Sequence, residues 1–212
     1  FCDIDHDGNQ LPYMDYHERW VAGNLEGLTA KVIACEGTQG SWYLTLPDFQ
    51  MFKENVAQGG YTAGLYPDSR ASEYGLAFNY GHKDPVLREL FNDLRWRQAT
   101  SHAMNRDEMN ELRFAGTGVP RQPIADPGAS FYEEGIDQYY VEYDPDKAND
   151  LLDEIGLAWD AKKEWRMRPD GQPLNLSLEF WAGKSNVAEI SELIRGYWAE
   201  IGINLTLKPE ER

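Results

Sequence analysis

The sequence is poor in several residue types and patterns, and each shortage excludes a class of protein. Its 212 residues include only 2 cysteines, Cys2 and Cys35. Two cysteines so far apart do not build a disulfide framework or a zinc site. No run approaches the roughly 18 apolar residues that cross a bilayer, and no basic segment followed by an apolar one marks a signal peptide. With 42% hydrophobic residues, the chain is expected to be globular.

Positive charge is also scarce. The 36 acidic residues outnumber the 20 basic ones, so the formal net charge is −16. A phosphate backbone would be repelled, and we expect no nucleic-acid partner. The one basic stretch, from Arg88 to Arg121, alternates with acidic residues at helical spacings. This spacing predicts solvated faces of ion pairs.

Catalytic and phosphate-binding motifs are missing. There is no HExxH, no GxSxG turn and no glycine-rich phosphate loop after a predicted strand. The four histidines stand apart from one another as His6, His17, His82 and His102. We therefore expect no enzyme, no catalytic residues, no metal site and no cofactor. A hydrolase acting on peptides or sugars is the alternative, and it would need a catalytic pair that the sequence does not show.

The opening stretch DIDHDGNQLPYMD resembles the start of a calcium-binding loop. Asp3, Asp5 and Asp7 stand at the first, third and fifth places of an EF-hand loop. The place of the bidentate Glu holds Met14, however, and Pro12 breaks the helix that should begin there. The stretch is therefore predicted to be a turn between two extended segments.

Hydrophobic periodicity alternates between strand and helix patterns, which predicts a mixed α and β fold. In the first third we expect a strand over 14–21, helices over 24–34 and 46–58, and strands over 61–66 and 74–80. In the middle, Pro85 opens a helix to Asn92, Asp93 caps a helix through Met104, and Asn105 caps one leading to Ala115. Residues 116–140 are rich in Gly and Pro and predict an irregular segment that lines a cleft.

The last third has the clearest pattern. Asp144 and Pro145 begin a helix that Gly156 ends, and residues 168–171 form a hairpin turn. Alternating residues over 174–180, helical spacing over 187–201 and alternation again over 203–207 predict a strand, a crossover helix and a strand. Such strands lie parallel, with a right-handed connection.

Aromatic residues are abundant, with 7 Trp and 12 Tyr. Most should fill the core, but rings in loops can also stack on sugars or pack against peptides. The candidates in loops are Trp42, Phe131, Tyr132 and Trp181.

Several stretches, read together, resemble the extracellular solute-binding proteins of ABC importers that handle dipeptides, oligopeptides, nickel and some oligosaccharides. The opening DHDGNQLPYMD is similar to a turn of this family, GNQLPYID. The run from Asp93 to Arg106 carries the DxRxRQAxxxAxxR skeleton. Other matching stretches follow in the family's order: TLPDFQMFKENVAQGGY, EYDPDKANDLLDEIGL, DGQPLNLSLEFW and LIRGYWAEIGINLTL. The resemblance covers nearly the whole chain.

The resemblance implies an α/β fold that is one lobe of a two-lobed periplasmic-binding-protein-like structure. It implies that the chain is a fragment, 1–212, of the C-terminal lobe, with 1–22 an opening strand and turn and 23–212 the body of the lobe. The acidic residue that meets a peptide's amino terminus in relatives lies beyond the segment matching 203–207. Ligand-anchoring residues are therefore expected outside this chain as well.

The implied function is capture of an oligopeptide outside the membrane and its delivery to an ABC permease. An oligosaccharide is the alternative solute, and a stand-alone interaction module is an alternative of another class. The resemblance further implies an extracytoplasmic, lipid-anchored and monomeric protein. We expect ligand contacts from two loops and a strand end, namely Phe78, Asn79, Tyr80, Pro120, Phe131, Trp181, Gly183, Lys184, Ser185 and Asn186.

Overall fold

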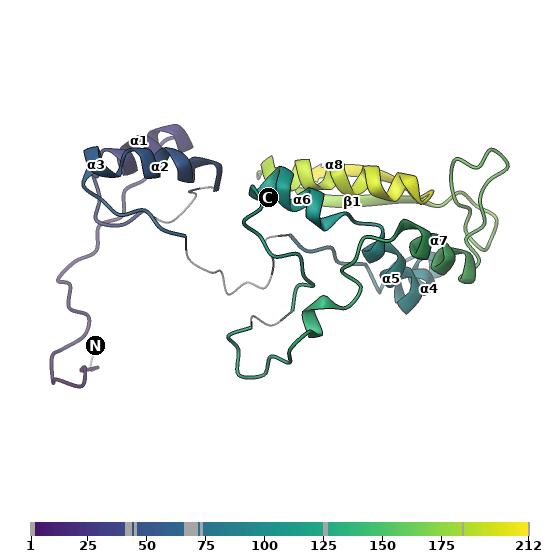
Figure 1. Cartoon of the computed structure of the whole chain (residues 1–212), viewed down its shortest axis with the longest axis horizontal. Helices are drawn as coiled ribbons and strands as arrows, with labels where there is room; N and C mark the ends of the chain where they lie inside the picture. Colours follow the sequence, from purple (N-terminus) through teal and green to yellow (C-terminus); the bar gives the residue numbers. More distant parts are fainter. Residues whose placement is uncertain are drawn as a thin grey trace. The chain divides into compact units, whose positions relative to one another are not determined.

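The computed structural model describes residues 3–40, 44, 46–65, 72, 74–124, 127–183 and 185–211, without the side chains of Pro47 and Ser185. The chain divides into two compact units, Phe1–Tyr66 and Pro67–Arg212. Figure 1 shows the helices and strands of both units. No helix of the described chain combines the length and the apolar character that a membrane span requires.

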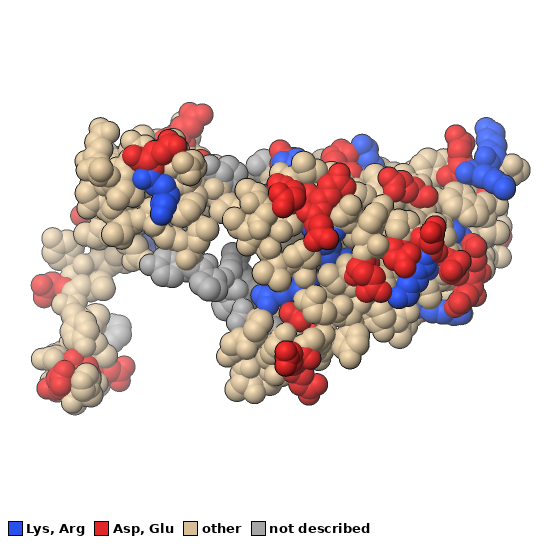
Figure 2. Space-filling model, viewed as in Figure 1, with Lys and Arg blue, Asp and Glu red and all other residues tan. Residues whose placement is uncertain are grey.

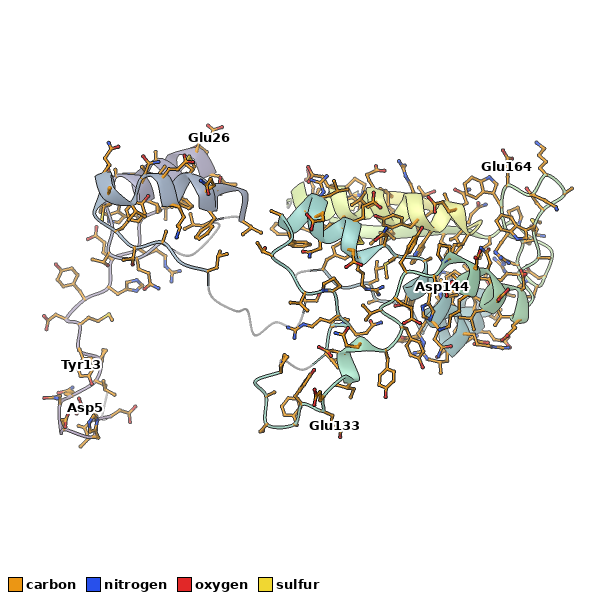
Figure 3. All side chains as sticks on the ribbon, in the orientation of Figure 1. Asp5, Tyr13, Glu26, Glu133, Asp144 and Glu164 are labelled. Carbon is orange, nitrogen blue, oxygen red and sulfur yellow. The ribbon has the colours of Figure 1, made fainter. Side chains whose placement is uncertain are left out.

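The opening stretch of the first unit is a turn, as the sequence predicts. Oδ1 of Asp5 accepts hydrogen bonds from the backbone N–H groups of Asp7 and Asn9, at 2.9 and 2.8 Å. Oδ2 of Asp5 accepts from the hydroxyl of Tyr13 at 2.6 Å, and the two side chains meet in Figure 3. Gly8, with φ of 85°, supplies the left-handed residue that reverses the chain. The carboxylate oxygens of Asp5 therefore serve the turn.

The rest of the first unit contains helices α1 (Leu25–Ile33), η1 (Leu46–Asp48), α2 (Phe49–Glu54) and α3 (Val56–Gly59). Asn24 caps α1 as predicted, because its side chain accepts from the N–H of Gly27. The continuous helix predicted over 46–58 is wrong. The stretch is instead interrupted at Asn55, whose φ and ψ of −97° and 2° lie outside the helical region. The side-chain nitrogen of Asn55 donates a hydrogen bond to Met51 O at 2.8 Å.

The strands predicted in the first third are not formed. Residues 14–21 form no strand, and they include exposed side chains such as Tyr16 and Val21. Residues 61–65 also form no ladder, and Tyr66 lies outside the described residues. The described residues of 74–80 keep the alternating burial of a strand without pairing to one. A strand needs a partner for its backbone groups, which side-chain alternation alone does not provide.

The second unit contains helices α4 (Pro85–Asn92), α5 (Leu94–His102), α6 (Arg106–Phe114), η2 (Ile136–Gln138), α7 (Pro145–Glu154) and α8 (Ser185–Glu200). Its strands are β1 (Asn175–Trp181) and β2 (Asn204–Glu210). The predicted caps of α5, α6 and α7 are present: Asp93, Asn105 and Asp144 each accept from a backbone N–H of the first turn. Helix α4 begins at Pro85 as predicted, and Asp84, which was not predicted as a cap, accepts from the N–H groups of Val86 and Leu87. The hairpin turn at 168–171 also forms, with Gly171 N donating to Arg168 O at 2.9 Å.

Strands β1 and β2 pair in parallel, joined by α8, as the sequence predicts. In the register, Asn175 faces Asn204 and Trp181 faces Glu210. Helix α8 packs on both strands, α6 on α8, and α5 on α4 and α7 (Figure 1). The described residues of 116–140 form an irregular loop after α6, interrupted by η2, and Figure 3 shows Glu133 at its outer part.

The hydrophobic core lies in the second unit, between α8, the two strands and helices α4, α5 and α7. Its fully buried members include Trp96, Leu152, Ile194 and Ile203. The rings of Phe78, Phe91, Trp96 and Trp198 form a cluster with centroid separations from 5.5 to 6.4 Å. Among the described hydrophobic residues of the first unit, only Phe52 is buried.

Candidate functional site

A cavity of about 1050 Å³ opens in the second unit. Its walls come from Ser72 and the segment at 74–80, from α5, α6 and α8, and from the loop at 116–140. These elements are distant in sequence, and the core packing of α6 on α8 and of α5 on α7 brings them together. A concave site of this size with mixed walls is typical of small-molecule binding.

One wall of the cavity is apolar and rests on the core. Phe78 anchors it: its ring stacks on Trp198 at 6.3 Å and 7°, and meets Trp96 edge-on at 5.9 Å. The alternating burial of 74–80 presents Phe78 and Leu76 on the same side of the segment. The apolar lining consists of Leu76, Phe78, Met104, Met109, Phe114, Ile190 and Ile194.

Another part of the wall is a hydrogen-bonded network centred on Ser101 of α5. Its hydroxyl donates to Tyr140 O at 2.7 Å and accepts from Arg106 Nη2 at 2.7 Å. It also accepts from Gln122 Nε2 at 3.0 Å, and Gln122 donates to Tyr139 O at 2.9 Å. The network attaches the loop at 116–140 to the helices, which gives the cavity a fixed polar edge.

The start of the same loop is held by Asn110 of α6. Its side-chain nitrogen donates to Gly118 O at 3.0 Å, and its side-chain oxygen accepts from Gly118 N at 2.9 Å. A Cβ on Gly118 would lie 2.7 Å from this oxygen, so the paired bonds require a glycine. A loop fixed at Gly118 and Gln122 places Pro120 in the cavity wall.

Two arginines line the cavity without an ion-pair partner among the described residues. Nη1 of Arg97 donates to the Tyr80 hydroxyl at 3.1 Å. Arg106 bonds Ser101 O at 2.8 Å and Val141 O at 3.3 Å, both uncharged acceptors. Burial lowers the pKa of Arg106. The predicted ion-pairing faces hold for Arg95, which pairs with Asp93, but the prediction is wrong for Arg97 and Arg106.

The residues predicted to contact a ligand separate into two groups. Phe78, Tyr80 and Pro120 line the cavity together, whereas Asn79 does not line it. Phe131 lies on the loop with 77% of its surface exposed, outside the cavity lining. Trp181, Gly183 and Asn186 lie at the turn from β1 to α8 and also stay outside it. Lys184 and Trp42 fall outside the described residues, and Ser185 is described by its backbone only.

Directly after β1, the chain keeps a backbone contact with β2. The backbone N–H of Ala182 donates to Glu210 O at 3.0 Å. The ring of Trp181 lies so close to Gly183 that a Cβ there would be 2.4 Å from it. Trp181 therefore covers the neighbouring backbone in this structure.

Sequence reasoning missed the polar half of the cavity, namely Arg97, Ser101, Arg106, Asn110 and Gln122. A signal was available for Arg97 and Arg106, because both stand in the DxRxRQAxxxAxxR skeleton. The described chain contains no group of three His, Cys, Asp or Glu residues placed to hold a metal ion.

A second, smaller cavity of about 640 Å³ lies along β2 and α8. Phe180, Leu205 and Leu207 contribute to its lining, together with the ion pair of Glu192 and Arg195. The lining has few hydrogen-bonding side chains compared with the larger cavity. The larger cavity is therefore the stronger candidate for a ligand site.

Comparison with known proteins places this chain among solute-binding proteins. The sequence model of the bacterial extracellular solute-binding proteins, family 5, middle region, matches residues 38–212. The dipeptide-binding protein of Escherichia coli is 28% identical over 56% of this chain and 20% of its own length. A probable ABC transporter-binding protein of Deinococcus radiodurans is 25% identical over 96% of this chain and 34% of its own length.

The fold has the same relatives. A solved structure of an oligopeptide-binding protein OppA superposes with a TM-score of 0.74 at 36% identity, over 90% of this chain and 31% of that protein. The chain thus spans about a third or less of the length of these relatives. The mixed α and β fold expected from the sequence is confirmed as that of periplasmic binding proteins. The chain belongs to the bacterial extracellular solute-binding proteins, family 5.

Proposed function

We propose that this chain is part of the solute-binding component of an ABC importer and that its larger cavity receives part of an oligopeptide. The observation that carries the proposal is the position of the cavity: all its lining residues, from Ser72 to Ile194, lie inside the region 38–212 that matches the family. Relatives of this region are named dipeptide-binding and oligopeptide-binding proteins.

The composition of the cavity suits a peptide. Phe78, Met104 and Met109 offer apolar surface for side chains, and methionine adapts to varied shapes. Gln98, Asn110 and Gln122 line the same space and offer amide groups for a peptide backbone. A site that combines adaptable apolar surface with backbone-directed polar groups accepts many sequences, which a peptide importer requires.

In this function no bond is made or broken. The chain would form one lobe, and closure of a second lobe over the solute would create the form that a permease recognises. We propose an extracytoplasmic and monomeric protein, lipid-anchored in its full length. The ligand contacts predicted at Asn79, Phe131 and 181–186 remain part of the proposal, as contacts on the rim of the site or with the second lobe.

The test is a thermal-shift screen of the full-length protein against pools of tripeptides to pentapeptides, oligosaccharides and single amino acids. A solute that binds only the folded state raises the melting temperature in proportion to the logarithm of its concentration. At 100 times the dissociation constant the stabilisation is about 2.7 kcal/mol. We expect this shift with peptides. A shift with oligosaccharides alone would replace the peptide by a sugar, and no shift with any pool would contradict solute capture.

Two variants locate the binding site. Tyr80→Ala removes an exposed ring from the cavity wall, whereas Trp181→Ala removes a ring at the turn outside it. We expect the first variant to lose most of the peptide-induced shift and the second to lose only a small part of it, because a contact on the rim contributes less than a contact in the cavity wall. The reverse result would move the site to the turn from β1 to α8. A hydrolysis assay on the same peptides tests the enzyme alternative, for which we expect no cleavage.

A further inference from the structure

We propose that Arg97 binds a carboxylate of the solute, the free carboxyl terminus when the solute is a peptide. This inference rests on the proposed function, because it names the chemical group that one wall of the proposed cavity receives. It is drawn from the surroundings of the Arg97 guanidinium, which differ from those of its neighbour Arg95 on the same helix.

Arg97 is half-buried in the cavity wall and is oriented by Tyr80. Nη1 donates to the Tyr80 hydroxyl at 3.1 Å, and the guanidinium carbon lies 5.5 Å from the centre of the Tyr80 ring. Nε is buried without a hydrogen-bond partner among the described residues. The remaining Nη hydrogens have no acceptor in the described part of the chain either. A guanidinium that Tyr80 holds in place and that has unused N–H donors is preorganised to bind an acceptor group of a ligand.

The acidic residues near Arg97 are engaged elsewhere. The carboxylate of Asp93 accepts hydrogen bonds from Nε and Nη2 of Arg95, at 3.1 and 2.7 Å. The pKa of Asp93 is lowered mainly by the hydrogen bond from Arg95, and the charge of Arg97 adds a smaller effect. Asp137, the carboxylate in the cavity lining, accepts from Tyr132 at 3.0 Å and lies 3.9 Å from Arg121.

Arg106 adds a second positive charge to the same cavity. Its Nη1 and Nη2 bond backbone carbonyls and the Ser101 hydroxyl, which leaves its charge without a counter-ion in the part that the structure describes. The chain as a whole carries a net charge of −16, and patches of acidic side chains are scattered over the visible surface (Figure 2). Two unneutralised guanidinium groups in one cavity of so acidic a protein therefore favour an anionic group there.

A carboxylate fits this wall better than an uncharged group does. The fork of a guanidinium matches the two oxygens of a carboxylate, and the pairing is strongest when a neighbour holds the fork in place. Apolar lining from Phe78, Met104 and Phe114 continues from the polar edge. The cavity thus suits a ligand with one anionic end and an apolar body, as a peptide's last residue has.

The experiment measures peptide affinity by calorimetry for a pair of ligands that differ in one group. Each peptide that binds the full-length protein is prepared with a free carboxyl terminus and with a carboxamide. In the wild type we expect the carboxamide to bind at least about tenfold more weakly, because a charge-assisted hydrogen bond is lost. In Arg97→Gln we expect the two forms to bind within about twofold of each other.

Matched variants separate the inference from general damage. Arg95→Gln removes a guanidinium two positions away that pairs with Asp93 outside the cavity, and it should keep the wild-type ratio. Tyr80→Phe loses only the hydroxyl that orients Arg97, and it should reduce the ratio in part. A ratio near one in the wild type, or an unchanged ratio in Arg97→Gln, overturns the inference while the peptide function stands. Binding of neither form by the wild type would instead overturn the proposed function.

Discussion

Arg166 shows how much a single residue can connect in this fold. Its side chain is fully buried, and its Nε donates to Ile201 O at 2.8 Å while Nη1 donates to Leu157 O at 2.6 Å. Nη1 and Nη2 also bond Asp153 and Asn149 on α7. The guanidinium therefore joins α7, the loop that follows it and the end of α8. A buried arginine is tolerated because nearly all its donors have acceptors.

Replacing this residue should destabilise the second unit strongly. Arg166→Met retains much of the volume but leaves the carbonyls of Ile201 and Leu157 without their donor. We expect the free energy of unfolding to fall by about 3 kcal/mol. Urea denaturation followed by circular dichroism measures this loss. The control is Arg195→Met, which removes an exposed pair with Glu192 and should cost less than about 0.5 kcal/mol. Equal losses in both variants would contradict the role given to Arg166.

Asp5 carries a prediction about pH. Hydrogen bonds from Tyr13, then from Asn9, lower the pKa of its carboxyl to about 2 from the usual 3.8. Because the folded pKa lies below the unfolded value, the turn is fully stabilised above about pH 4. This stabilisation is lost as the pH falls from 3.8 toward 2. An NMR titration of the carboxyl carbon should give a midpoint near 2, and Tyr13→Phe should raise it. A midpoint at the ordinary value would mean that the turn opens in solution.

Residue-scale features divide into those that the sequence predicted and those that it could not. The turn at Asp5 was predictable because its donors lie within a few residues of one another. Phe78 and Tyr80 were predicted as ligand contacts from the end of an expected strand, and the cavity does contain them. Arg97 and Arg106 were misjudged, because helical spacing reveals possible ion pairs on a helix but does not reveal which face turns into a cavity.

At the level of elements, the helices follow from local chemistry. Asp144 is the N-cap of α7, and its carboxylate accepts from the N–H of Lys147 at 2.9 Å. Pro145 sets the backbone angle of the first helical position. Caps of this kind depend only on neighbours in the chain, so the starts of α1 and of α4 to α7 were all predictable.

Removing the cap of α7 should therefore have a measurable and limited effect. We expect Asp144→Ala to lower the free energy of unfolding by about 1 kcal/mol. Asp146→Ala, in the first turn of the same helix, loses only its interaction with the helix dipole and should cost about 0.3 kcal/mol. Thermal unfolding of both variants measures the difference. If the two costs are equal, the hydrogen bond to Lys147 N adds nothing to the stability of the helix.

Strands followed a different rule. β1 and β2 were predictable because a crossover helix between two alternating segments defines both partners and their direction. The segments at 14–21, 61–66 and 74–80 had the side-chain pattern without any indication of a partner. Pairing depends on residues far away in the sequence, and periodicity carries no information about them. The described parts of these segments form no strand.

At the scale of the whole molecule, buried surface is distributed unevenly between the two units. Helix α1 has no buried residue. Among the described residues of the first unit, Phe52 is the only hydrophobic residue that is buried. Helices α5 and α8 of the second unit carry a continuous core that includes Trp96, Ala99 and Ile194. Stability should differ accordingly, because local opening is easiest where little apolar surface is buried.

Hydrogen exchange measured by mass spectrometry tests this contrast. We expect peptides that cover α5 and α8 to exchange at least about tenfold more slowly than peptides that cover α1 and α2. Helix α6, which has no buried residue but packs on α8, should be intermediate. Equal protection of α1 and α8 would show that the first unit is stabilised by contacts other than its own core.

The cluster of Phe78, Phe91, Trp96 and Trp198 beside the cavity gives the protein an intrinsic fluorescent probe. Phe78 lines the cavity on one side and on the other stacks against Trp198, which meets Trp96 edge-on at 6.4 Å. Indole emission depends on the immediate surroundings of the ring. A solute that displaces Phe78 would therefore change the emission wavelength or intensity of Trp96 and Trp198 without contacting either ring. Occupancy of the cavity would then be visible in unlabelled protein, in real time, by a change in tryptophan fluorescence.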